Sequence, residues 1–213
     1  MERRDRATAD RRARELLCKT ITGDGDLLEV LQLWRFKPNR TRKNVVPEGV
    51  PFVFSETLGL VRSRTGKFIM TNIARQYGNV FMLLCKWLAD NMPPGLKHPF
   101  PFTSINVNYD YGARIHRDVN NLGASLTKSC GCFAGGEPLY WCGDEGLTPL
   151  DRMCACLPSN SKSPLWLSMA HASSRRILSK GVNPSSSPQY KSSPPAKHPN
   201  DFVIDAPMLF PSR

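Results

Sequence analysis

The clearest run of regularly spaced apolar residues lies between positions 73 and 88. Seven apolar side chains there follow the spacing of an α-helix with one buried face: Ile73, Tyr77, Val80, Phe81, Leu84, Trp87 and Leu88. Pro93 and Pro94 follow this run, and proline ends a helix because it lacks the amide hydrogen. We therefore predict a helix over 73–88 that packs its apolar stripe into a core.

The regions on either side of this helix have different patterns. Residues 1–44 are basic and helical in character, with six arginines from Arg3 to Arg14 and a second short helix that begins at Asp26 as its N-cap. We interpret these charges as a solvated helix face in preference to a nucleic-acid contact. Short β-rich runs separated by turn residues occur at Val50–Phe54, Phe102–Val107, Ala113–His116, Ala124–Leu126 and Leu139–Trp141.

These patterns predict an α+β fold, mainly β, with short strands packed against helices. We divide the chain into a basic helical N-terminal region (1–44), a globular domain (45–178) and a Ser/Pro-rich tail (179–213). Eleven of the residues in 179–199 are Ser or Pro, a composition that buries too little apolar surface to order itself. The tail is therefore predicted to be disordered, with at most a short docked segment in the apolar stretch Phe202–Phe210.

Composition limits the class of protein. The chain has 213 residues, 40% of them hydrophobic, which excludes a wholly disordered chain. The net charge of 29 − 18 = +11 favours an anionic partner, nucleic acid or an acidic protein. No apolar run approaches the ~20 residues of a membrane-spanning helix, and the first residues lack the apolar core of a secretory signal. An odd count of seven cysteines then favours reduced thiols and an intracellular location, in an unspecified compartment.

One stretch carries residues suited to metal chemistry. His116 and Asp118 are two positions apart, so on an extended segment their side chains project to the same face. An imidazole and a carboxylate, completed by one distant imidazole, form the facial triad of non-haem Fe(II) oxygenases. A lone His-x-Asp is common, so its sequence context decides how it is interpreted.

The sequence around this pair resembles a known superfamily. The runs Phe102–Tyr109, His116–Asn121 and Phe133–Glu137 resemble Fe(II)/2-oxoglutarate-dependent dioxygenases, most of all their prolyl-hydroxylase-like and TET/JBP-like branches. The resemblance covers residues 50 to 146. It implies a partial double-stranded β-helix (jelly roll), a bound Fe(II) and the co-substrate 2-oxoglutarate, with His116 and Asp118 as the first two iron ligands.

The resemblance is weaker in the C-terminal half, which is divergent or truncated. Family members carry a second ligand histidine downstream, and the choices here are His171, in an apolar stretch, and His198, in the Ser/Pro-rich tail. We choose His171 as the third metal ligand. Arg175 and Arg176 follow it more closely than the family's 2-oxoglutarate-binding cation does, so neither receives that role. A proline directly after the Gly-Gly-Glu turn also interrupts the strand expected there.

Two local alternatives stay open. Five cysteines offer thiolates for zinc: Cys130, Cys132, Cys142, Cys154 and Cys156. Their C-x-C spacing lacks the two-residue spacer of structural zinc sites, and buried core thiols are the simpler interpretation. Asn106 and Asn108 share a strand face and contact either a co-substrate or nearby backbone.

The sequence thus predicts an Fe(II)/2-oxoglutarate-dependent oxygenase-like protein that hydroxylates an unknown substrate. The alternative is a catalytically inactive relative or fragment that acts as a basic binding module. Turnover of 2-oxoglutarate that disappears in His116→Ala and Asp118→Ala supports the enzyme. Salt-sensitive nucleic-acid binding that survives both changes supports the module.

Overall fold

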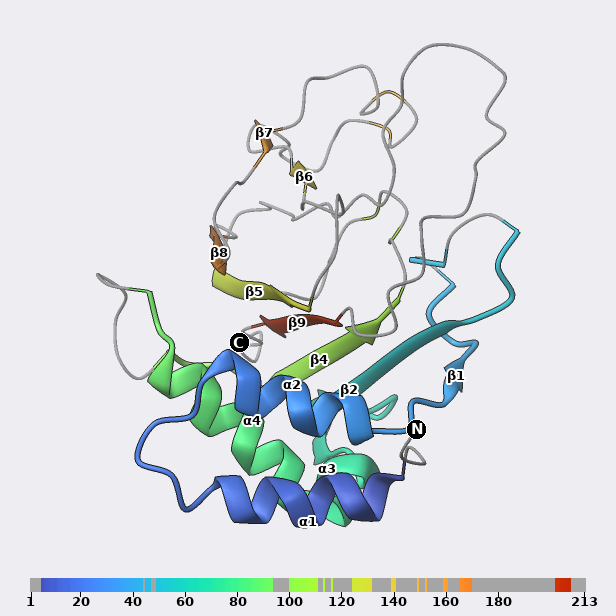
Figure 1. Cartoon of the computed structure of the whole chain (residues 1–213). Coiled ribbons are helices and arrows are strands. Elements are labelled where there is room, and N and C mark those ends of the chain that lie inside the picture. Colours follow the sequence, from blue (N-terminus) through green and yellow to red (C-terminus); the bar gives the residue numbers. More distant parts are fainter. Residues whose placement is uncertain are drawn as a thin grey trace.

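An antiparallel sheet covered on one face by helices forms the body of the chain (Figure 1). This computed structural model describes residues 5–43, 45–46, 49–93, 100–110, 113, 116, 124–131, 139–140, 149, 152, 159–160, 165–169 and 202–207. The helices are α1 (Arg6–Leu16), α2 (Asp24–Leu33), α3 (Asn72–Gln76) and α4 (Gly78–Asp90). None of the helices in this part of the chain is long and apolar enough to cross a membrane.

The strands of the main sheet are all paired antiparallel. They are β1 (Pro38–Asn39), β2 (Val53–Arg62), β3 (Phe68–Met70), β4 (Ser104–Tyr109), β5 (Ala124–Cys130), β8 (Leu165–Met169) and β9 (Phe202–Pro207). Their order is β1-β2-β4-β9-β5-β8, and β3 pairs with the far end of β2. A separate pair joins β6 (Leu139–Tyr140) to β7 (Ser159–Asn160). The mixed α+β class predicted from the sequence is confirmed.

Strand β9 lies in the apolar stretch Phe202–Phe210, where the prediction of a disordered tail allowed a short docked segment. Residues Phe202–Pro207 lie in the centre of the sheet, paired with β4 on one side and β5 on the other, so they are not disordered. The Ser/Pro-rich composition ends at Pro199, and Ile204 within β9 is buried, with 2% of its surface exposed. The burial of Ile204 between two neighbouring strands provides the apolar burial that stabilises this segment. The division of the chain at residues 44 and 178 remains a prediction.

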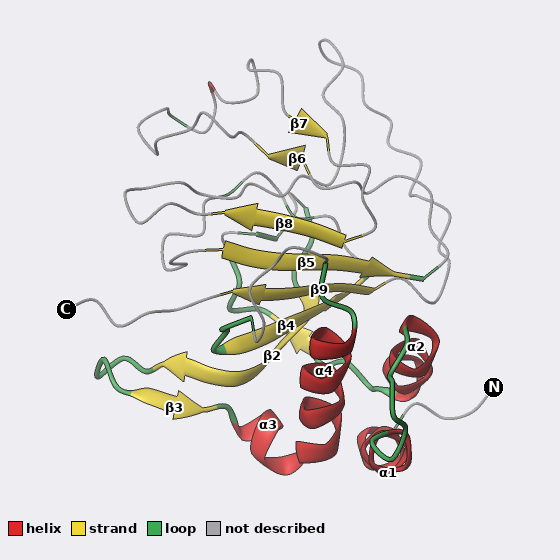
Figure 2. Cartoon of the chain, turned by 90° about the vertical axis from the view of Figure 1, so that its left-hand side faces the viewer, coloured by secondary structure: helices red, strands yellow, loops and turns green. Residues whose placement is uncertain are grey.

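The helices α1, α2 and α4 pack on the same face of the sheet (Figure 2). Ala9 and Ala13 of α1 have no exposed surface, and their small side chains let the helix approach its neighbours closely. Leu83 and Trp87 of α4 are also buried, and each such side chain contributes roughly 1.5–3 kcal/mol of apolar burial. The charge-rich N-terminal segment is therefore a helix with a narrow apolar face, part of the same core.

The predicted helix over 73–88 is two helices in the structure. Tyr77 lies between α3 and α4 with φ −123° and ψ 60°, outside the helical region. The carboxylate of Asp10 in α1 accepts hydrogen bonds from the backbone N–H of Val80 (3.1 Å) and from the side chain of Asn79 (2.7 Å). Such a cap satisfies an amide at the start of α4 that the helix itself leaves unpaired.

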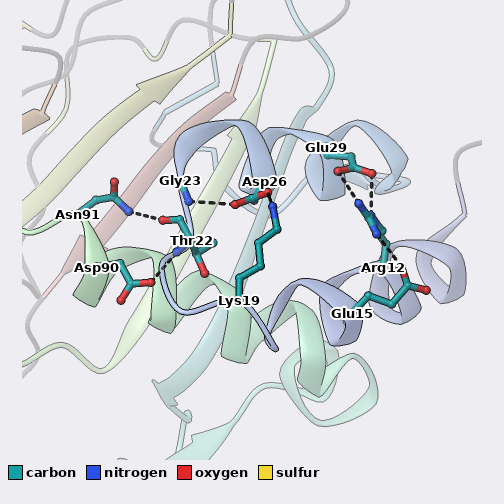
Figure 3. A network of polar contacts seen from close by, with 9 residues as sticks. All are labelled: Arg12, Glu15, Lys19, Thr22, Gly23, Asp26, Glu29, Asp90 and Asn91. Atoms are coloured by element: carbon teal, nitrogen blue, oxygen red, sulfur yellow. Dashed lines mark hydrogen bonds and ion pairs between the residues drawn. The ribbon is translucent and has the colours of Figure 1, made fainter.

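The connection from α1 to α2 is tied to the end of α4 (Figure 3). The N–H of Thr22 donates to Asp90 (2.8 Å), and the Asn91 side chain donates to the Thr22 carbonyl (2.7 Å). The N-cap of α2 is Gly23, so the prediction of Asp26 as N-cap is wrong: Asp26 instead accepts from the Gly23 N–H at 3.1 Å. A carboxylate three residues into a helix satisfies the same orphan donors from the other direction.

Candidate functional site

The two faces of the sheet differ in chemistry because side chains alternate along each strand. On β4, Ile105 and Val107 belong to the core cluster that includes the helices. Ser104 and Asn106 lie between them in sequence and therefore point to the opposite face. Both are buried, with 3% and 7% of their surfaces exposed. The face away from the helices is thus polar and yet withdrawn from water.

Neighbouring strands continue this polar layer. On β2, antiparallel pairing with β4 sets Ser55 opposite Asn108 and Thr57 opposite Asn106. On β5, Thr127 pairs with the same β9 residue as Asn106 does, so the two side chains face the same side of the sheet. Ser125 is two residues from Thr127 and therefore faces that side as well. Ser55 and Ser125 are 1% and 0% exposed. We call the side chains of Ser55, Thr57, Ser104, Asn106, Asn108 and Ser125 the polar layer.

Hydrogen bonds fix the orientation of Asn106 within the polar layer. Its carbonyl oxygen accepts from the Thr57 hydroxyl at 2.9 Å and from the Ser55 hydroxyl at 3.4 Å. Its amide nitrogen donates to the Asn108 side chain at 3.1 Å. Because the two ends of the amide have different partners, Asn106 cannot flip without losing both sets of bonds. The sequence left open whether Asn106 contacts backbone or a co-substrate, and its partners here are side chains.

Two further features suit a polar or anionic ligand. Arg42 donates to the Ser55 hydroxyl at 2.8 Å. It is half-buried, and none of the described carboxylates pairs with it. The Ser125 hydroxyl is buried without a hydrogen-bond partner in the part of the chain that the structure describes. A hydrogen bond or ion pair from a polar ligand would stabilise both the half-buried cation and the unsatisfied hydroxyl.

The predicted metal ligands are only partly within the described residues. His116 follows the end of β4 by seven positions and is buried, with 7% of its surface exposed. Asp118, His171 and the alternative His198 lie outside the described residues. Among the residues that are described, no three His, Cys, Asp or Glu side chains come together as a metal site. The set His116, Asp118 and His171 therefore stays a prediction.

The cysteines are described at only a few positions. Cys130 is buried in the helix-facing core, and burial raises the pKa of its thiol to about 12. Burial also raises the pKa of the Cys85 thiol in α4, to about 11. Metal ligation requires the thiolate, so both environments disfavour it and suit core packing. Cys132, Cys142, Cys154 and Cys156 lie outside the described residues.

A buried carboxylate that sequence analysis did not single out lies on the helix-facing side. Glu56 of β2 forms an ion pair with Arg6 and accepts from the Trp34 indole N–H (2.7 Å) and the Lys37 backbone N–H (3.2 Å). Burial raises the pKa of Glu56, while the positive charge of Arg6 acts in the opposite direction. All the described partners of Glu56 join helices and loops to the sheet, so its role is structural.

Other residues of the polar layer also escaped the sequence analysis. Ser55 and Thr57 alternate with the core residues of β2, so their period of two carried a signal that they share a face. Arg42 carried none, because only the fold brings the loop before β2 beside Ser55.

Comparison with known proteins adds little to this geometry. No family model matches the chain, and no curated protein matches it. Among solved structures the chain is similar to the structure of OsALKBH1, with 14% sequence identity and a TM-score of 0.41 over 97% of this chain and 92% of that one. A likeness this distant leaves the function of the chain to be inferred from its own residues.

Proposed function

We propose that the chain is an Fe(II)- and 2-oxoglutarate-dependent oxygenase-like protein whose main sheet is one wall of a jelly roll. The observation that carries the proposal is the polar layer, in which four of the six side chains are buried. A sheet whose second face is solvated would leave these polar side chains exposed, whereas Ser55, Ser104 and Ser125 are at most 3% exposed. His116 is also buried, and it lies seven positions after the end of β4, the strand that carries Asn106.

The chemistry of the available side chains fits this assignment. Two imidazoles and one carboxylate match the ligand preference of non-haem Fe(II), and we propose His116, Asp118 and His171 for these roles. A dicarboxylate such as 2-oxoglutarate needs a cation and hydrogen-bond donors. Arg42 offers the cation on the described part of the chain, whereas the unpartnered Ser125 hydroxyl lies three strands away from Ser55, on β5, beyond the reach of the same dicarboxylate. When bound, iron and the oxoacid would supply O₂ activation, with hydroxylation of a C–H bond coupled to conversion of 2-oxoglutarate to succinate and CO₂.

The chain's own residues would bind and orient the co-substrate. The locked amide of Asn106 presents a fixed dipole next to the Ser55 hydroxyl, which Arg42 polarises through its 2.8 Å hydrogen bond. Groups held in advance do not have to reorganise when a ligand binds, which favours binding in one orientation. Burial of the layer also keeps water away from the groups that would hold the ligand.

The direct test is iron titration of the purified chain, followed by measurement of succinate formation from 2-oxoglutarate. We expect stoichiometric Fe(II) uptake and succinate formation in the wild type, with both lost in His116→Ala, Asp118→Ala and His171→Ala. His198→Ala is the matched control, because it removes an imidazole from the Ser/Pro-rich segment and should change neither. Failure of the wild type to take up Fe(II) overturns the oxygenase proposal.

The second candidate is an inactive relative that acts as a basic binding module, and the net charge of +11 favours it. The substrate or partner is then proposed to be nucleic acid or an acidic protein. Binding that weakens steeply with salt but is unchanged in His116→Ala, in a wild-type chain that takes up no iron, would support the module.

A further inference from the structure

Exposed apolar side chains are concentrated in the hairpin formed by β2 and β3. Six large hydrophobic residues are exposed among the described ones, and three of them lie in this hairpin. Leu60, Phe68 and Ile69 are 38%, 39% and 46% exposed. Figure 2 shows β3 at the end of the sheet far from β5 and β8. Clustered exposed apolar residues are typical of interaction surfaces.

These side chains lie on both faces of an unpaired edge. Leu60 pairs with Met70, so these two side chains share one face of the sheet. Phe68 is two residues from Met70 and lies on the same face, whereas Ile69, between them, points to the other face. Strand β3 pairs with β2, and no other described strand pairs with its outer side. The Ser63 N–H donates to the Lys67 carbonyl at 2.8 Å, so by the alternation of an antiparallel ladder the N–H and C=O groups of Phe68 and Met70 face outward.

The hairpin is also strongly basic. Arg62, Arg64 and Lys67 are exposed, and no ion pair to them occurs among the described residues. From residue 57 to residue 89 the sequence contains no Asp or Glu at all. The outward edge of β3 is therefore flanked by uncompensated positive charge. Charge complementarity calls for an acidic partner.

We infer that the outer edge of β3 binds an extended, acidic segment of a partner protein by strand addition. An added strand places its side chains alternately on the two faces of the sheet, so it would cover Phe68 on one face and Ile69 on the other. Its main chain would pair with the outward groups of Phe68 and Met70. Acidic residues beside its apolar positions would meet Arg62, Arg64 and Lys67.

Other occupants fit these observations less well. Edge-to-edge pairing of two copies would bring two sets of cations together without a carboxylate between them, which like-charge repulsion opposes. A nucleic acid would neutralise the cations but would not cover aliphatic side chains on both faces of the strand. The inference goes beyond the proposed oxygenase and does not depend on it, since the hairpin lies at the end of β2 opposite to Ser55.

The test uses the full chain and a fluorescent synthetic peptide of about ten residues that alternates valine and threonine with glutamate, a length that spans an ordinary strand. We expect saturable binding that weakens with salt. The triple variant Arg62→Ser, Arg64→Ser, Lys67→Ser should bind about tenfold more weakly, at roughly 0.5 kcal/mol for each rim charge. The matched control Arg11→Ser, Arg14→Ser, Arg35→Ser removes the same charge from exposed positions outside the hairpin and should bind like the wild type.

Amide hydrogen exchange distinguishes strand addition from general charge attraction. Peptide binding should protect the Phe68 and Met70 amides, whose N–H groups face outward, and should leave the Ile69 amide nearly unchanged because it already pairs with β2. Phe68→Ser with Ile69→Ser should weaken binding while far-UV circular dichroism stays native, since both side chains are exposed.

Each opposite outcome overturns the inference. An equal loss of peptide affinity in the matched control would show that the site does not select acidic strands. Equally tight binding of a peptide with lysine in place of glutamate would show the same. A single-stranded oligonucleotide that competes for the hairpin without protecting Phe68 and Met70 would assign the surface to nucleic acid. Dimerisation through protected β3 amides, measured by sedimentation without peptide, would assign it to a second copy.

Discussion

Removal of Arg6 tests whether the buried ion pair with Glu56 holds the N-terminal helix to the sheet. The two side chains are 11% and 8% exposed. In Arg6→Met, Glu56 keeps its hydrogen bonds from Trp34 and Lys37 but loses its counter-charge. Breaking one partner of a buried pair typically costs ~3–5 kcal/mol because the remaining charge is buried without compensation. Methionine keeps the length and the helix propensity of the position, but the substitution also removes the hydrogen bond from Arg6 to the Arg35 carbonyl (2.8 Å) and the contact of the guanidinium with the Trp34 ring.

Arg12→Met is the matched control within the same helix. Arg12 also forms ion pairs, with Glu29 and Glu15, both at 2.7 Å, but its side chain is 36% exposed. Exposed pairs contribute about 0–1 kcal/mol. Urea unfolding at pH 7, followed by circular dichroism, should therefore give a much larger loss of unfolding free energy for Arg6→Met than for Arg12→Met. Equal small losses in both variants would refute the reasoning.

The pH dependence of the Arg6→Met defect provides a second check. Burial raises the pKa of Glu56 in the folded chain, so its ionisation opposes folding, and that cost grows as the pH rises through the folded pKa. Without Arg6 the cost increases. The difference in unfolding free energy between wild type and Arg6→Met should thus become smaller as the pH falls through the pKa of Glu56 in the folded chain, because the carboxyl then becomes neutral. Adding Glu56→Gln should remove most of this pH dependence, and a gap independent of pH would contradict the assignment.

Further predictions concern single positions. Gly59→Ala should destabilise the chain by about 1–3 kcal/mol in urea unfolding, because the residue has φ +113° and a Cβ there would lie 2.6 Å from a backbone carbonyl oxygen; Gly25→Ala, with nothing within 4 Å, should cost nothing. Cys130, whose pKa is raised to about 12 by burial, should resist iodoacetamide in the native chain while the exposed Cys18 reacts, as mass spectrometry would show. Asp10→Ala should cost ~1 kcal/mol of unfolding free energy through loss of the α4 cap, and no measurable loss would show that the cap contributes nothing.

Local patterns in the sequence located many of the elements. The apolar stripe from Ile73 to Leu88 lies in α3 and α4, because an amphipathic period of 3.6 is a property of neighbouring residues. The β-rich run at Phe102–Val107 overlaps β4 for the corresponding reason, with a period of two. The break at Tyr77 was not visible, since it depends on how the two helices meet α1 and the end of β3.

The candidate site was predictable only in part. The His-x-Asp spacing drew attention to His116, and the fold buries that residue. The polar layer required knowledge of which strands lie side by side: Thr57 and Asn106 are 49 residues apart in sequence and 2.9 Å apart in the fold. Arg42 is likewise 13 residues from the hydroxyl to which it donates.

The sequence by itself determined the α+β class, the approximate positions of the α4 and β4 segments and the excess of positive charge, because each follows from composition or from spacing within one element. Only the tertiary structure decided that Phe202–Pro207 lies between β4 and β5, that Glu56 receives Arg6, and that the sheet has a buried polar face. These are contacts between segments distant in sequence. Their free energy comes from surfaces brought together by folding, which no local pattern encodes.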